Sequence, residues 1–552
     1  MDAWDTEKAE DTVSLENDEE CIVFEISSDE QKFEFIAWIL DISEQEFKQG
    51  SKFLEDHNTS FCVLWRLFSY LDVFTVTVEN YYVDRVYRDS YYFYFSSKHF
   101  NYARFCKRLC LFYGRLEKDF YDYLSGELEE IFMGSIVLRP IVNRSIGRTL
   151  LNPRYFLPHE VPWKIRLAEY NVTVYGKKLH IRAFPYSMQD GETTSCAEIT
   201  ILNLLDYYSE SYPEYHYILP SEISKLAEMN SFERRMPTTG LSYELISKIF
   251  CEVGFYPRLY SAQKMAKTKF RHMLYYYIES GIPVALGLKL GDENKHSVIS
   301  IGHVAPDKEH IGRELSCAYD SQSRCAIWIC DTADTVGSYC IMDDNKTPYQ
   351  FSLCTEEKDD IADMPLLKLD GCEVEYMMVP LYKRMIMEAA DAYDICLTIL
   401  ASVQFGIKDF MHRYMPEECG TKENPVVVRL FMASSRTFRK ARDEQFQEKN
   451  HEVRDLYNMT IFPKFIWVCE LATRELYAEG RVMGEVIIDA TSSADRKTDS
   501  FIIIHYPGVI CRRMPEDCAE VRDAEFEEIK DWHLFQAFHD NLDTNAWINS
   551  VY

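Results

Sequence analysis

Between about residues 186 and 385 the sequence changes from helix patterns to strand patterns, and this order constrains the fold more than any other feature. We expect helices that begin at Cys196 and that cover 242–253 and 264–281, the last two closed by glycines. The apolar runs PVALGLKL, HSVISIGH, CAIWIC and SYCIMDD follow and are typical of strands. Helices first and strands after predict an α+β domain with a helical half and an antiparallel sheet half.

The chain has 552 residues, which is too long for one compact core and predicts several domains. We expect a disordered acidic tail over 1–20, an accessory α/β domain over 21–185, the α+β domain over 186–385, and an accessory α+β domain over 386–552. Within the first accessory domain, the β-branched and aromatic residues of 74–95 predict strands.

Charge and composition limit the compartment and the partners. The formal net charge is −29, which would repel a polyanion and argues against nucleic acid as a partner. No stretch approaches eighteen uninterrupted apolar residues, so no membrane partner is expected. The first twenty residues are acidic and unlike a secretory signal, and the seventeen cysteines are an odd number. We therefore expect reduced thiols in a cytoplasmic protein.

One cysteine stands at a helix start. In TTSCAEIT, Ser195 is followed three residues later by Glu198, which is the spacing of a capping box. This makes Ser195 the N-cap and Cys196 the first helical residue. A thiol at this position lies at the positive end of the helix dipole, which favours the reactive thiolate, although a buried structural cysteine has the same sequence appearance.

Two later strands supply partners for such a thiol. His296 begins the strand HSVISIG, and the strand SYCIM ends on the consecutive acids Asp343 and Asp344. A cysteine nucleophile needs an imidazole to take and return its proton, and the imidazole needs an acceptor that fixes its tautomer. Cysteine, histidine and acid occur here in that chain order.

Residues 186 to about 350 resemble the papain-like cysteine peptidase fold and, within it, the bacteriocin-processing (double-glycine leader) peptidase branch. The shared features are a helix-opening cysteine, a GxPV strand seen here as GIPV, the HSVISIG strand, and a strand that ends on an acid. The resemblance implies that Cys196 is the nucleophile, His296 the base and Asp343 the orienting acid. It also implies that Gln189 contributes its side-chain amide to the oxyanion hole.

The chain departs from the family pattern at three places. Gln189 lies seven residues before the cysteine where the family has six, so Asp190 takes the expected position. The family's Cys-Gly pair is Cys-Ala here. An insertion over 303–337 separates the histidine strand from the acid strand, and it leaves Asp344 and Asp331 as alternative acids.

The resemblance implies a cytoplasmic cysteine peptidase, a thiol hydrolase without a cofactor, that acts on an intracellular protein or peptide in a regulatory role or in bacterial conflict. Two alternatives stay open. The same Cys-His-Asp chemistry serves acyl transfer of the transglutaminase or arylamine acetyltransferase kind. A non-catalytic interaction protein could also retain the fold. The oligomeric state is not readable from the sequence.

Two other constellations favour structure over function. Six possible zinc ligands lie in and near the insertion: His303, His310, Cys317, Cys325, Cys330 and Cys340. The chain contains no CxxC pair, and the spacings of these residues fit no standard zinc motif. We therefore expect no metal site. His303 should also face away from the sheet side that His296 faces. An anion clamp is less expected than ordinary salt bridges for Arg139, Arg144 and Arg148.

Overall fold

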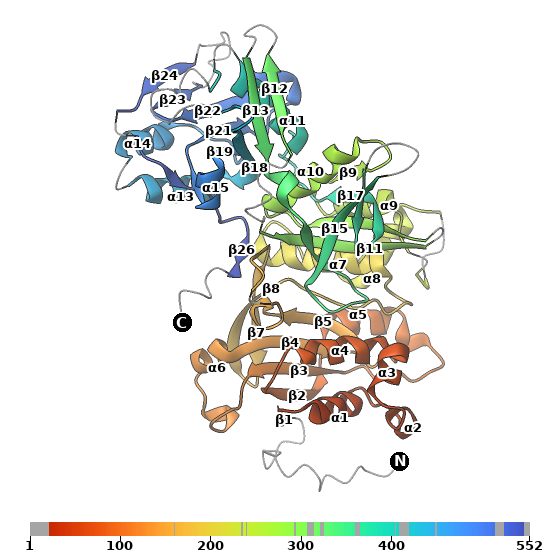
Figure 1. The fold of residues 1–552 in the computed structure, drawn as a ribbon. Helices are drawn as coiled ribbons and strands as arrows, with labels where there is room; N and C mark the ends of the chain where they lie inside the picture. The colour runs from red at the N-terminus through yellow and green to blue at the C-terminus, as the bar shows by residue number, and fades with distance from the viewer. Residues whose placement is uncertain are drawn as a thin grey trace.

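The computed structural model shows a mixed α+β protein in which three large sheets follow one another from the bottom to the top of the view in Figure 1. The expected acidic tail, 1–20, lies outside the described residues. The structure describes residues 21–545 apart from 159, 233–235, 239, 292–293, 306–313, 321–324, 359–364, 403–404, 408–418, 448–449, 514–523 and 531.

The first sheet is antiparallel and has the strand order β1-β2-β3-β4-β5. Its strands are β1 (Cys21–Ile26), β2 (Phe74–Tyr82), β3 (Cys106–Tyr113), β4 (Phe132–Leu138) and β5 (Ile146–Leu151). The helices of this region are α1 (Asp29–Ile39), α2 (Glu44–Phe47), α3 (Ser51–His57), α4 (Thr59–Ser69), α5 (Arg85–Phe93) and α6 (Ser125–Ile131).

The strand prediction over 74–95 is wrong in its second half, where α5 forms. Asp84 caps this helix, since its carboxylate accepts a hydrogen bond of 2.7 Å from the Tyr87 backbone N–H. Tyr87 and Ser90, three residues apart, are its buried side chains. An N-cap and helical spacing therefore outweigh the strand preference of a tyrosine-rich segment.

The second sheet carries the region where the sequence analysis placed the α+β domain. Its strand order is β10-β17-β16-β15-β14-β11-β6-β26, β9 adds to β17, and a further pairing of β10 with β11 closes the strands from β10 round to β11 into a ring. The strands are β6 (Trp163–Ile165), β9 (Arg258–Ser261), β10 (Val284–Leu290), β11 (Asn294–Val304), β14 (Ser338–Met342), β15 (Gln350–Lys358), β16 (Pro365–Leu369), β17 (Cys372–Val379) and β26 (Asp543–Thr544).

Four helices belong to this region: α7 (Cys196–Ser211), α8 (Pro220–Met229), α9 (Tyr243–Glu252) and α10 (Lys267–Glu279). Of these, α7, α9 and α10 form where the sequence patterns predict helices, and α8 was not predicted. Every residue of α7 from Ala197 to Tyr208 is buried, including the polar Glu198, Asn203 and Asp206. One face of α7 contacts β11, and another contacts the hairpin of β7 (Ala168–Val174) and β8 (Lys177–Ala183).

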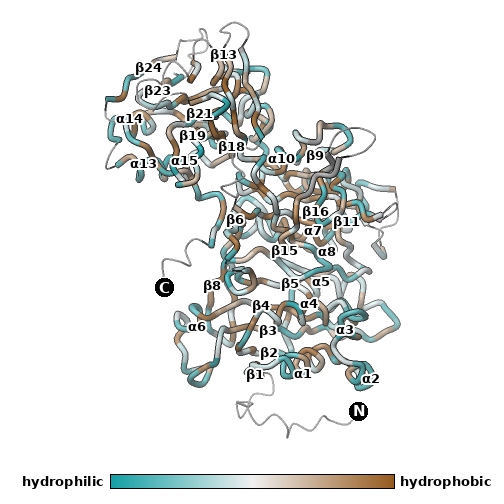
Figure 2. Tube along the Cα trace, viewed as in Figure 1, coloured by the Kyte–Doolittle hydropathy of each residue, from teal (hydrophilic) through white to brown (hydrophobic). Residues whose placement is uncertain are grey.

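The third sheet has the order β12-β13-β18-β19-β21-β22-β23-β24. Its interior strands are almost entirely apolar and buried (Figure 2). The strands are β12 (Ser316–Asp320), β13 (Cys325–Asp331), β18 (Val426–Ser434), β19 (Phe465–Ala472), β21 (Gly484–Asp489), β22 (Phe501–Tyr506), β23 (Val509–Arg512) and β24 (Glu525–Glu528). Beside them lie α11 (Ala389–Ala401), α13 (Ser435–Phe446), α14 (His451–Met459), α15 (Arg474–Ala478) and the pair β20 (Arg481–Val482) and β25 (Phe535–Gln536).

The sheets do not follow the expected bounds of the 186–385 domain. Strands β12 and β13, from within that range, join the third sheet, where β13 pairs in parallel with β18. Strands β6 and β26, from outside it, pair with each other and extend the second sheet beyond β11. Each open strand edge exposes backbone groups that another segment can satisfy, and local sequence does not state which segment will do so.

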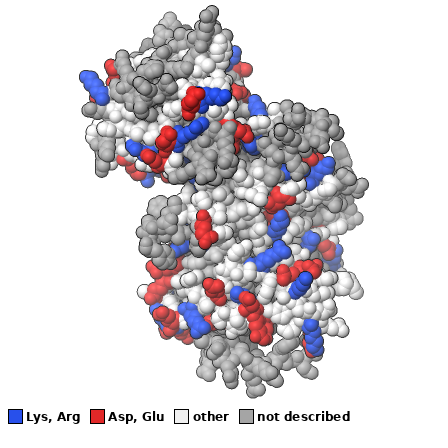
Figure 3. Space-filling view, viewed as in Figure 1, with Lys and Arg blue, Asp and Glu red and all other residues white. Residues whose placement is uncertain are grey.

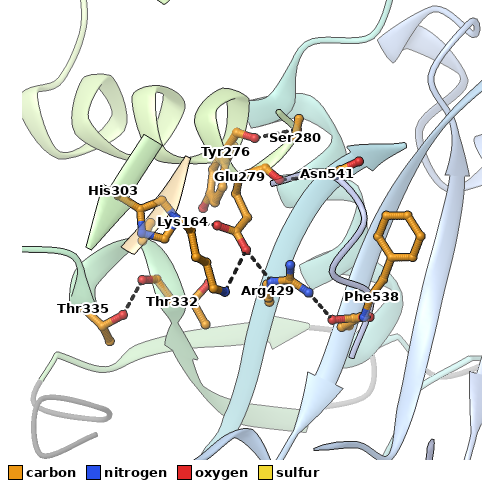
Figure 4. Close-up of polar contacts among 12 residues, drawn as sticks. Lys164, Tyr276, Glu279, Ser280, His303, Thr332, Thr335, Arg429, Phe538 and Asn541 are labelled. Atoms are coloured by element: carbon orange, nitrogen blue, oxygen red, sulfur yellow. Dashed lines mark hydrogen bonds and ion pairs between the residues drawn. The ribbon is translucent and has the colours of Figure 1, made fainter. Parts of the chain in front are cut away.

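A buried charge cluster joins the second and third sheets (Figure 4). Glu279, the last residue of α10, accepts hydrogen bonds from His303 Nε2 at 2.5 Å and from Arg429 Nε at 2.7 Å, and it lies 3.6 Å from Lys164 Nζ. Arg429 also binds Glu470, at 2.6 Å. These groups come from α10, β11, β18, β6 and β19, so one carboxylate ties several separate elements together.

Two findings bear on the expected absence of nucleic-acid and membrane partners. On the face drawn in Figure 3, Lys and Arg side chains are interspersed with Asp and Glu side chains. In the part of the chain that the structure describes, no helix is both long enough and apolar enough to cross a membrane.

The charge cluster yields a stability prediction. Glu279→Gln should lower the free energy of unfolding by about 3–5 kcal/mol, because Arg429 and Lys164 lose a buried counter-charge. Urea unfolding followed by tryptophan fluorescence measures this. Lys48→Gln, which removes an exposed ion pair with Glu44, is the control and should leave the midpoint unchanged. Equal midpoints for the two variants would show that the cluster does not hold the sheets together.

Candidate active site

The predicted capping box is present at the start of α7. Ser195 Oγ accepts from the Ala197 backbone N–H at 3.3 Å, and Glu198 accepts from the Ser195 backbone N–H at 3.0 Å. The Glu198 carboxylate is buried and also accepts a hydrogen bond of 2.6 Å from the Thr238 hydroxyl. Cys196 is consequently the first residue of a helix whose N-terminal end is held by the capping box and by the Thr238 hydroxyl.

The loop before the helix is organised by Asp190. Its Oδ1 accepts from the backbone N–H groups of Glu192, Thr193 and Thr194 at 2.8, 2.7 and 2.9 Å. This closed turn requires the backbone of Gly191 in the left-handed region, with φ 76°. Asp190, which occupies the position where the family pattern has glutamine, therefore has a structural role in placing the cysteine.

His296 and Asp343 lie together although 47 positions separate them. His296 Nε2 is 2.8 Å from Asp343 Oδ1 and 3.6 Å from Asp344 Oδ1. The pairing of β11 with β14 sets this geometry, since His296 lies near the start of one strand and the acids follow the end of the other. Both carboxyl groups and the imidazole are buried.

The pKa values follow from this arrangement. Burial lowers the pKa of His296, but hydrogen bonds to Asp343 and to the Cys196 thiol, together with the two negative charges, raise it to about 10. Burial also opposes ionisation of Asp343, yet its hydrogen bond with His296 holds the pKa of that carboxyl below its usual range. Burial raises the pKa of Asp344 to about 7. Because Asp343 faces Nε2, the other ring nitrogen of His296 is left for the thiol.

Cys196 and His296 line the same cleft, which has a volume of about 1140 Å³. Tyr243 and Tyr376 form part of its wall, with ring centroids 5.0 Å apart. Tyr243 also donates a hydrogen bond of 3.3 Å to the His296 backbone carbonyl. Gly287 on β10 makes this packing feasible, since a Cβ there would collide with the Tyr243 ring.

Two other site predictions have a different outcome. The Gln189 side-chain amide donates to Asn345 Oδ1 at 3.1 Å, and its part in an oxyanion hole stays a prediction. Asp331 is not near His296: it binds the hydroxyl of Tyr276 and lies 3.4 Å from His272. The insertion carries Asp331 into the third sheet, at the end of β13.

The remaining candidates from the sequence have structural partners. His303 binds Glu279 and does not line the cleft, as its spacing from His296 predicts. Arg139 donates to three backbone carbonyls, and Arg148 forms an ion pair with Asp206, so these two are structural. Of the cysteines and histidines in the zinc alternative, His310 and the side chain of Cys325 lie outside the described residues. The others form no group of three metal ligands in the described part of the chain.

Sequence reasoning missed residues that position the site. Asn345 connects Gln189 with Asp343, because its backbone N–H donates to Asp343 Oδ1 at 3.0 Å. Thr200 on α7 donates to Cys196 O at 2.9 Å and accepts from the Ser297 hydroxyl at 3.0 Å, which joins the cysteine helix to the histidine strand. The hydroxyl of Thr200 four residues after Cys196, on the same helix face, was the available signal.

In comparisons with known proteins, no family model and no curated protein sequence matches this chain.

The capping box yields a prediction on thiol reactivity. Ser195→Ala should lower helix stability by about 1 kcal/mol. It should also slow alkylation of Cys196 at pH 6 by more than this loss explains, because a frayed first turn weakens the dipole that favours thiolate. Labelling rates beside urea midpoints measure both effects. Ser43→Ala, at the capping box of the exposed helix α2, is the matched control and should leave labelling unchanged.

The histidine yields a prediction on protonation. We expect the His296 imidazole to remain doubly protonated at pH 8, and Cys196→Ala to lower its pKa, because one of the groups that raise it is removed. Its folded pKa of about 10 exceeds the unfolded value of about 6.5. Its contribution to stability is therefore complete below about 6.5 and lost as the pH rises through about 10.

Nitrogen-15 NMR of histidine-labelled protein measures this titration, with His296→Gln to assign the signal. A neutral His296 ring at pH 7, or the same titration in Cys196→Ala, would contradict the expected contact between thiol and imidazole.

Proposed function

We propose that this chain is a papain-like cysteine hydrolase, a peptidase, in which Cys196 is the nucleophile, His296 the proton carrier and Asp343 the group that orients His296. The observation that carries the proposal is the convergence of Cys196 and His296 on one cleft while Asp343 holds the far nitrogen of the ring. A helix-opening cysteine packed against the histidine strand of a closed sheet supports the resemblance to the papain-like fold.

The chemistry follows from the protonation states. A protonated His296 beside the thiol favours the Cys196 thiolate, which attacks a carbonyl carbon and forms a tetrahedral intermediate. The Cys196 backbone N–H, at the first residue of α7, is the group that we propose to stabilise the oxyanion. The imidazolium then gives its proton to the leaving amine, which departs and leaves a thioester. His296 takes a proton from water, the resulting hydroxide attacks the thioester, and the acid product and the thiol are released.

The cleft favours a polypeptide as substrate. Its volume of about 1140 Å³ is larger than a typical small-molecule pocket, and its wall combines aromatic side chains with charged ones. Lys295 lines the wall, and its side chain is 62% exposed although its Nζ lies 3.3 Å from Glu375. The cysteine-rich composition suits a reducing compartment, and we propose an intracellular protein substrate.

The decisive test is selective alkylation. With a small alkylating reagent at pH 6, intact-mass analysis should show one early adduct, located at Cys196 by peptide mapping. Cys196→Ala should abolish it, and Cys251→Ala, which removes an exposed cysteine, should not. His296→Gln should slow the labelling and lower turnover of a peptide library by about 10²–10⁴-fold.

Labelling of several cysteines at similar rates, or unchanged labelling in His296→Gln, would contradict an activated Cys196. If Cys196 labels selectively but peptides are consumed only when an amine acceptor is added, acyl transfer replaces hydrolysis as the reaction.

A further inference from the structure

Asp344 has no part in the proposed triad, which uses one carboxylate. Its side chain is 3% exposed, and neither carboxylate oxygen forms a hydrogen bond of ordinary geometry with the described residues. The backbone N–H of Gln189 and the His296 ring, 3.6 Å away, are the nearest groups that favour its charge. A buried carboxylate with so few partners costs free energy and calls for a physical explanation.

The position of Asp344 beside His296 and Asp343 supplies a physical explanation for its burial. Ligand atoms of His296, Asp343 and Asp344 lie within 4.8 Å of one another, and all three residues are buried. Ligands of a tetrahedral zinc ion at about 2.0–2.2 Å are roughly 3.4 Å apart. The distances from His296 Nε2 to the two carboxylates, 2.8 and 3.6 Å, lie on either side of that value. One imidazole and two carboxylates suit zinc and similar divalent ions.

The surroundings of the three ligands also suit an ion. The Asn345 backbone N–H donates to Asp343 Oδ1 and fixes the orientation of that carboxylate, as outer hydrogen bonds do at metal sites. The nearby cations are Arg144 and Lys346. The charge of Arg144 lowers the pKa of Asp344, and Lys346 Nζ lies 3.8 Å from Asp343 Oδ2. The Lys346 side chain is 46% exposed, so it is able to turn into solvent when an ion binds.

We propose that His296, Asp343 and Asp344 form a zinc-class divalent cation site and that a bound ion switches off the thiol. The ion takes the lone pair of Nε2, and the proton from that nitrogen passes to solvent. The other ring nitrogen keeps its hydrogen and is unable to accept a further proton, so His296 no longer carries protons between the thiol, water and the leaving amine. The proposal that the ion inhibits the thiol rests on the proposed function, whereas the proposal that an ion binds here does not.

The test measures binding directly. The full chain, freed of metal with a chelator, is titrated with Co²⁺ followed by visible absorption and then with Zn²⁺ as competitor. One ion per chain is expected, with a spectrum of nitrogen and oxygen ligands and no sulfur charge-transfer band. Asp344→Asn should weaken binding by at least about tenfold. Cys196→Ala should retain it, and Asp495→Asn, at an exposed position, is the matched control.

Circular dichroism shows whether Asp344→Asn folds, and His296→Asn is a second ligand variant if it does not. Absence of binding at one equivalent, or binding lost in Cys196→Ala but kept in Asp344→Asn, would overturn the site. The two proposals fail separately. If an ion binds but Cys196 is unreactive, the metal site is supported and the proposed hydrolase is not. If Cys196 is reactive but Zn²⁺ does not protect it from alkylation, the proposed inhibition by the ion is wrong.

Discussion

The contact between the second and third sheets depends on the ion pairs and hydrogen bonds of the buried Glu279 carboxylate. Glu279 ends α10, and its three cationic or imidazole neighbours come from β6, β11 and β18. A charge in this interior is tolerated only where partners compensate the loss of water. The elements must therefore meet at one point, and β11 is fixed at His303. The same strand carries His296 seven residues earlier, so the cluster and the cleft share a rigid support.

The part of the site that the sequence could predict is the part determined locally or by chain order. Ser195 and Glu198 lie within one helical turn, so their reciprocal hydrogen bonds follow from spacing alone. His296 and Asp343 were found because strand starts and strand ends are visible as patterns, and neighbouring antiparallel strands bring such ends together. Local patterns thus pointed to Cys196, His296 and the acids that follow β14, and the family resemblance selected Asp343 of the two acids.

The rest depends on contacts between distant segments, which patterns do not contain. The transfer of β12 and β13 into the third sheet depends on the open edge of β18, about a hundred residues further along the chain. Asp331 was a plausible acid only while its strand was assigned to the wrong sheet. Likewise, the sequence does not show that the Asp190 carboxylate closes the loop before α7.

The two consecutive acids show how a turn changes what a strand would dictate. Within a strand, neighbouring side chains point to opposite faces. Since β14 ends at Met342, Asp343 and Asp344 lie beyond the pleat, and both carboxylates reach His296. Asp343 also receives a backbone N–H and is the natural acceptor for the ring, whereas Asp344 adds negative potential with little compensation. A second carboxylate buried there lowers stability unless a positive charge stays close to it, which is why the protonation of His296 and the binding of a cation are alternative solutions to one electrostatic problem.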